Sequence, residues 1–138
     1  MNNPLIFKSP ETLDEFAVEF DFCWACAAKD RPTVWQGGLQ IHHWAGGRYG
    51  RSDIRHNLIR VCVKCHELAG SYIHRQANGL VVPTLTRGAC LWLKKLHDPD
   101  FWDPKILEKL TRQSLPEIEP PDSYYLDQYR TRRPWEFR

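Results

Sequence analysis

The chain has 138 residues, of which 42% are hydrophobic and 26% charged, and its formal net charge is +2 at pH 7. This composition is typical of one globular domain and excludes a wholly disordered chain. The small net charge does not by itself indicate a polyanionic partner. No secretory signal pattern opens the sequence, and no run approaches the roughly 20 apolar residues that span a bilayer. We therefore expect a cytoplasmic protein without membrane contact, in which thiols stay reduced.

The N-terminal part of the sequence predicts one helix. Ser9 fits an N-cap, Pro10 the first helical position and Glu11 an acidic first turn. Apolar residues then recur at helical spacing, so we expect an amphipathic helix from Pro10 to Glu19.

The middle of the chain predicts strands and a helix. β-branched and aromatic residues from Thr33 to Trp44, interrupted by a glycine pair, indicate a hairpin whose second strand is Leu39 to His43. A long polar segment follows from Gly46 to Asn57. The run "LIRVC" then leads to Cys65, after which apolar spacing indicates a helix that stops at Asn78-Gly79.

The last third predicts helices followed by an arm. A stripe from Leu85 to Leu96 indicates one helix, and Asp103-Pro104 begins another. Beyond Leu115 the sequence is proline-rich, then aromatic and basic, as expected of an extended arm.

Two cysteine pairs dominate the candidate functional residues. Cys23 and Cys26 form one Cys-x-x-Cys pair, and Cys62 and Cys65 form another. Four soft ligands in two tight turns predict a structural Zn²⁺ site that leaves no position open. The alternatives are a redox pair or small buried apolar residues, which explain two pairs less well than one. Cys90, within a predicted apolar stripe, is expected to be a buried core thiol.

Histidines and an asparagine lie in and beside the loop that the cysteine pairs close. The order "IHHWAGG", "HNLIRVC", "CHELA" resembles the HNH endonuclease family over about Cys23 to Ile73. The resemblance implies an α+β fold with a ββα-metal core, also called an HNH or His-Me finger. A four-cysteine zinc site would staple this core, and an N-terminal helix and C-terminal helices would flank it. Compact members of this family occur in phages, so a phage-encoded protein in the host cytoplasm is one expected setting.

The resemblance also implies a role for each residue of the motif. His42 and His66 match the ligands of a catalytic divalent ion, expected to be Mg²⁺ or Mn²⁺. His43 matches the general base, and Asn57 the asparagine that holds the loop. Some members have a further histidine one helical turn later, where this chain has Gly70, so no third protein ligand is assigned. Other interpretations are a surface residue for His42, a core histidine for His43 and a neighbour of the zinc for His66.

Three arginines, Arg48, Arg51 and Arg55, lie between the expected base and the asparagine. Guanidinium groups there would contact DNA phosphates without reading sequence, although a solvated charged loop has the same composition. The tail "YRTRRPWEFR" suits DNA contact, a homodimer, a partner protein or folding back on the domain.

These observations divide the chain into four segments. They are an N-terminal helical segment (1–22), the HNH core with its zinc knuckles (23–78), a C-terminal helical extension (79–115) and the tail (116–138). The leading hypothesis is a metal-dependent endonuclease that hydrolyses DNA phosphodiester bonds by nicking or double-strand cleavage. The alternatives are a non-catalytic zinc-binding module for nucleic acid and a thiol-disulfide enzyme.

Overall fold

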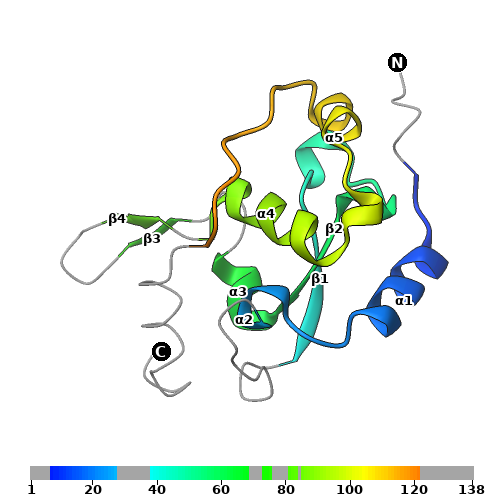
Figure 1. Ribbon diagram of the computed structural model, residues 1–138, viewed down its shortest axis with the longest axis horizontal. Coiled ribbons are helices and arrows are strands. Elements are labelled where there is room, and N and C mark those ends of the chain that lie inside the picture. Colours follow the sequence, from blue (N-terminus) through cyan, green and yellow to red (C-terminus); the bar gives the residue numbers. More distant parts are fainter. Residues whose placement is uncertain (1–6, 28–37, 69–72, 76–80, 84, 122–138) are drawn as a thin grey trace.

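The chain folds as a mixed α+β structure. The computed structural model describes residues 7–27, 38–68, 73–75, 81–83 and 85–121 (Figure 1). Within these residues the strands form two antiparallel pairs, β1 with β2 and β3 with β4. No helix in the described part of the chain has the length and apolar character needed to cross a membrane.

Helix α1 (Pro10–Glu19) has the bounds that the sequence predicts. Ser9 caps it by accepting a hydrogen bond from the Thr12 amide, and a proline occupies the first turn. Its buried face carries Phe16, and Phe20 follows directly. Both rings contact Trp24 of the short helix α2 (Trp24–Ala27), so α1 is anchored beside the first cysteine pair.

Strands β1 (Leu39–His43) and β2 (Leu58–Cys62) form the central hairpin. Leu39 lies opposite Cys62, and His43 lies opposite Leu58. Residues 44–57 connect the strands through two short turns, η2 (Gly47–Tyr49) and η3 (Arg55–Asn57). The β1 strand is confirmed, but its partner in the described residues is β2. The predicted first strand of a hairpin, from Thr33, lies outside the described residues.

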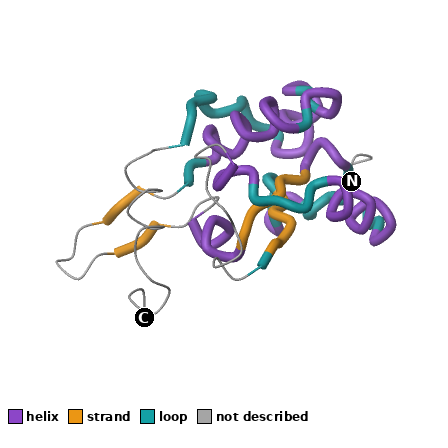
Figure 2. The backbone as a smooth tube through the Cα atoms, turned by 60° about the horizontal axis from the view of Figure 1, so that its bottom comes forward, coloured by secondary structure: helices purple, strands orange, loops and turns teal. Residues whose placement is uncertain are grey.

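The segment after the second cysteine pair differs from the prediction. Helix α3 (Val63–Leu68) is short, and residues 73–75 lie in β3 (Ile73–Arg75), which pairs with β4 (Val81–Pro83). A helix reaching Asn78-Gly79 is therefore wrong. β-Branched residues favour extended backbone, and an Asn-Gly pair is as typical of hairpins as of helix ends. Figure 2 shows β3 and β4 on one side of the molecule, away from the β1–β2 hairpin.

The last third forms the two predicted helices, α4 (Arg87–His97) and α5 (Pro104–Thr111), joined by the turn η4 (Pro99–Phe101). Gly88 allows the later chain to pass close to α4, because a Cβ there would lie 1.8 Å from the Glu117 carbonyl oxygen. Residues 114–121 contain no helix or strand, and the rest of the predicted arm lies outside the described residues. One core joins α1, α2, β2, α4 and α5, and its largest fully buried apolar members are Phe16, Trp24, Leu58, Ile59, Leu91, Leu93 and Leu107.

Candidate functional site

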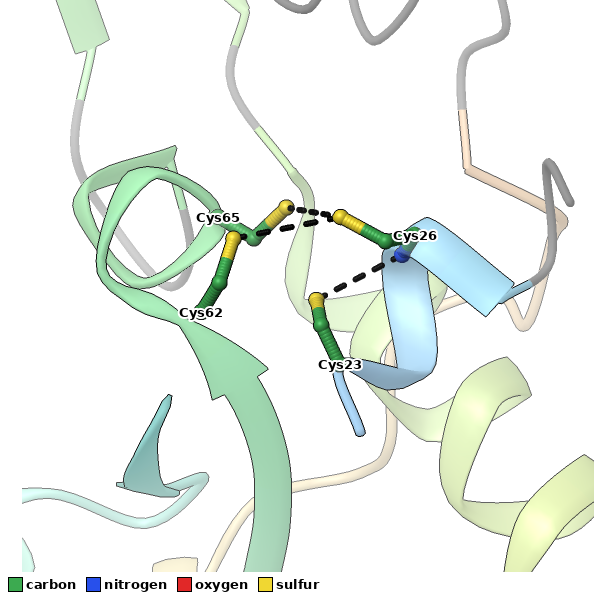
Figure 3. Close-up of side chains that lie close together, drawn as sticks. All are labelled: Cys23, Cys26, Cys62 and Cys65. Atoms are coloured by element: carbon green, nitrogen blue, oxygen red, sulfur yellow. Dashed lines mark hydrogen bonds between the residues drawn. The ribbon is translucent and has the colours of Figure 1, made fainter. Parts of the chain in front are cut away.

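The four paired cysteines meet at one end of the β1–β2 hairpin. Cys23 and Cys26 come from α2 and the residue before it, Cys62 ends β2, and Cys65 lies on α3 (Figure 3). Their sulfur atoms all lie within 4.8 Å of one another, and the four residues are at most 1% exposed. The Cys26 sulfur lies 3.9 Å from the sulfurs of both Cys62 and Cys65.

This cluster fits a tetrahedral metal ion. A zinc–sulfur bond of about 2.3 Å places tetrahedral sulfurs roughly 3.8 Å apart, which matches the observed 3.9 Å. The neighbouring thiols, Cys23 first among them, together with burial raise the pKa of Cys65 well above its ordinary value. A bound divalent cation offsets the cost of gathering thiolates here. The cluster can therefore bind a structural metal such as zinc, and four sulfur ligands would leave the ion no open position.

The two adjacent histidines lie near the other end of β1 and point to opposite faces. The pairing with β2 is regular through both residues, so no bulge turns one ring toward the other. His42 lies on the face of Gln40, toward α3, and His43 faces the loop that follows β1. The strand therefore stays regular through the doublet, and the two rings lie on different sides of it.

His42 and His66 form a pair of imidazoles. Their ring centroids are 5.2 Å apart in an edge-to-face arrangement. The Nδ1 atom of His66 hydrogen-bonds the side-chain oxygen of Gln40, which leaves the lone pair of that ring on Nε2. The Nε2 atom of His42 is buried and has no hydrogen-bond partner among the described residues. Burial, followed by the charges of His66 and His43, lowers the pKa of His42 to about 3.

His43 is held by a carboxylate. Its Nε2 lies 2.8 Å from Oδ1 of Asp53. Burial alone would raise the pKa of Asp53, but the amide of Ser9 and His43 hold it below its ordinary value. An ionised carboxylate only accepts, so Nε2 of His43 donates and Nδ1 carries the lone pair. Nδ1 is buried and finds no partner in the part of the chain described. Burial lowers the pKa of His43, against the opposing effect of Asp53.

Asn57 holds the loop between the strands. It is fully buried, and its side-chain oxygen accepts from the Ala45 amide at 2.7 Å. Its side-chain nitrogen donates to the carbonyls of Ala45 and Ser52, at 3.2 and 2.8 Å. Asn57 thus fixes the backbone two residues after His43 and directly before Asp53.

A buried lysine supports the same turn from α4. Nζ of Lys94 donates to the carbonyls of Arg55 and Leu58, on either side of Asn57, and to Asp98. Burial lowers the pKa of Lys94 to about 8, although its bond to Asp98 opposes this change. Lys94 is 0% exposed, so its three acceptors replace water around the ammonium group.

The three loop arginines have different surroundings. Arg51 is exposed, with a positive φ of 53°. Arg55 instead makes a bidentate ion pair with Asp98 and a second ion pair with Glu19. The guanidinium carbon of Arg55 also lies 4.2 Å from the centroid of the Phe101 ring. These contacts already occupy the Arg55 guanidinium, and the phosphate contact by Arg55 stays a prediction. The side chain of Arg48 lies outside the described part of the structure.

Sequence reasoning did not single out four residues around the histidines: Gln40, Asp53, Arg87 and Lys94. The guanidinium of Arg87 lies 3.9 Å from the centroid of the Trp44 ring and donates to the Trp44 carbonyl. Two of the four carried a weak signal, since Gln40 precedes His42 by two positions on a strand and Asp53 is the one acid between His42 and Arg60.

Comparisons of this chain with protein-family models, with curated proteins and with solved structures gave no match.

Proposed function

We propose that the chain is a metal-dependent endonuclease of the HNH type that hydrolyses DNA phosphodiester bonds. The order of elements supports this proposal, because β1, a loop, β2 and α3 follow one another as in a ββα-metal core. The positions of the motif residues support it too. His42 and His43 end β1, Asn57 precedes β2, and His66 lies on α3.

One observation carries the proposal: Asp53 holds His43 through Nε2, while Nδ1 has no partner among the described residues. A general base needs one anchored nitrogen and a lone pair on the other that can take a proton, and His43 has both. Asp53 also stabilises the imidazolium that forms when Nδ1 accepts the proton. His43 would therefore activate the water that attacks phosphorus.

His42 and His66 are the residues that would hold the catalytic ion. The buried, unpartnered Nε2 of His42 suits metal binding, and so does the contact of Gln40 with Nδ1 of His66, because a second hydrogen bond commonly orients a ligating histidine. A divalent ion such as Mg²⁺ or Mn²⁺ would supply charge stabilisation for the phosphoryl and leaving oxygens. The thiol cluster would hold a separate, structural zinc ion.

The charges around His42 favour an anionic substrate. Arg51 and Arg87 both lie close enough to His42 to lower its pKa. Arg51 is exposed, and stacking on Trp44 orients Arg87. These two guanidinium groups could bind phosphate groups of DNA beside the histidines.

The test is nicking of supercoiled plasmid by the zinc-loaded protein with added Mg²⁺ or Mn²⁺. We expect cleavage by the wild type and a loss of about 10³-fold in His43→Ala, because a general base contributes roughly 10²- to 10⁴-fold. His74→Ala is the matched control, since it removes a histidine from β3, away from the β1–β2 hairpin, and should cleave like the wild type.

Zinc content should be the same in both variants. His43→Ala should stay folded with a lower free energy of unfolding, because it removes a partner of the buried Asp53 carboxylate. Equal cleavage by His43→Ala and the wild type would overturn the assignment of the base. DNA binding by the wild type without cleavage under any divalent metal would instead favour the non-catalytic zinc-binding module.

A further inference from the structure

Asp53 is buried in a loop whose other charged residues are cationic, and it is held from three directions. Oδ1 accepts from Nε2 of His43 at 2.8 Å, and Oδ2 accepts from the backbone amide of Ser9 at 2.8 Å. The Asp53 amide donates to the carbonyl of Phe7, also at 2.8 Å. The carboxylate therefore cannot rotate without losing a partner on one side or the other.

Residues 7–9, just before α1, fasten this loop. Besides the contacts of Phe7 and Ser9 with Asp53, Nζ of Lys8 donates to the carbonyls of Gly50 and Arg51. Residues 7–9 lie more than a dozen positions before Cys23, where the segment that resembles the HNH family begins. The strand–loop–strand–helix order of that segment therefore does not account for these contacts.

We propose that Asp53 is the positioning residue of His43 and that the N-terminal segment 7–9 holds it in place. Asp53 keeps the proton of the neutral ring on Nε2, so Nδ1 presents its lone pair to the attacking water. This inference rests on the proposed function for its catalytic meaning, but the position of the proton is measurable without any cleavage.

The contact with Ser9 makes one substitution decisive. In Asp53→Asn the oxygen of the new amide must face the Ser9 amide, because that group can only donate. The NH₂ group then faces Nε2 of His43, which must accept and so lose its proton. The proton moves to Nδ1, and the lone pair that the reaction needs is no longer there.

The test is ¹⁵N NMR of the imidazole nitrogens in the zinc-loaded protein above pH 7.5, with the His43 signals assigned from their absence in His43→Gln. We expect His43 protonated at Nε2 in the wild type and at Nδ1 in Asp53→Asn. The kcat for DNA cleavage by Asp53→Asn should fall by about 10²- to 10⁴-fold, because His43 then carries its proton on Nδ1. KM should change little, because the DNA contacts remain.

Asp103→Asn is the matched control. It removes the same charge from another hydrogen-bonding aspartate, the N-cap of α5. We expect a small loss of stability and no change in the His43 tautomer or in kcat.

A wild-type His43 protonated at Nδ1 overturns the proposal, and so does a proton that stays on Nε2 in folded Asp53→Asn. If Asp53→Asn does not fold, the wild-type spectrum alone decides. A wild type that cleaves no DNA but shows the switch of tautomer would contradict the proposed nuclease and leave the role of Asp53 toward His43 standing.

Discussion

The two ends of the β1–β2 hairpin bring together polar side chains in different ways. At the Cys62 end, four buried sulfur atoms contact one another, and a single ion can satisfy all of them. At the His43 end, the rings of His42 and His66 contact each other, while His43 is bound to Asp53. Asp53 and Gln40 orient His43 and His66, while Nε2 of His42 and Nδ1 of His43 have no partner among the described residues. The sulfur atoms of the cysteine end contact one another directly, whereas the orientation of His43 and His66 depends on hydrogen bonds from Asp53 and Gln40.

The largest expected effect comes from breaking the cysteine end. In Cys62→Ser a weak ligand replaces a thiolate, and the free energy that metal binding contributes to folding is lost. We expect loss of the bound zinc and of the cooperative unfolding transition, measured by elemental analysis and circular dichroism. Cys90→Ala, which removes a buried cysteine from α4, should keep its zinc and lose only about 1 kcal/mol. Retention of zinc by Cys62→Ser would contradict a four-cysteine site.

A smaller effect is expected from breaking the support of the histidine end. Asn57→Ala leaves the buried amide of Ala45 and the carbonyls of Ala45 and Ser52 without their partner. At 1–3 kcal/mol for each unsatisfied group, with partial relaxation, we expect a loss of about 3 kcal/mol in the free energy of unfolding. Urea unfolding measures this loss, and zinc content should be unchanged because the cysteines lie at the other end of the hairpin.

Asn57→Asp tests separately the two hydrogen bonds that the Asn57 side chain donates. It keeps an oxygen for the Ala45 amide but cannot donate to the two carbonyls, so it should not restore stability. Wild-type stability in either variant would show that the contacts of Asn57 do not hold the loop.

The cysteine end could be predicted from sequence more completely than the histidine end. The spacing of the cysteines indicates their geometry locally, because two residues separate the members of each pair and two such pairs are typical of a zinc site. Helix α1 could be predicted equally well, because its cap, its proline and its apolar residues lie close together in the sequence. At the histidine end the sequence showed the motif residues, but it did not show which side chains hold them in place.

The supporting contacts were hidden because they join residues far apart in the sequence. His66 and Gln40 are 26 residues apart, and Ser9 and Asp53 are 44 apart. Arg55 illustrates the same limit. Its sequence neighbours indicate a solvated basic loop, but Asp98, 43 residues later, pairs with it inside the molecule. A pattern of residue types shows which groups carry charge, and only the folded chain shows which of those charges are already paired.

The last prediction concerns the pH dependence of stability, to which a buried lysine behind the histidine end contributes. Lys94 lies behind the histidine end, and burial lowers its pKa from 10.5 to about 8. Between these values the unfolded chain keeps the proton that the folded chain has released, so stability rises with pH over this window. The contribution approaches about 1.4 kcal/mol per pH unit for one proton.

Lys94→Met should therefore lose stability relative to the wild type as the pH rises from 8 to 10, measured by urea unfolding of zinc-loaded protein. Lys95→Met, which removes an exposed neighbour on α4, should follow the wild-type profile. Zinc-ligand protonation cancels in the comparison, because all three proteins keep the same cysteines. If Lys94→Met and the wild type have parallel profiles, the ammonium group keeps its proton in the folded state. Its bonds to Asp98 and the carbonyls beside Asn57 would then outweigh the cost of burying the charge.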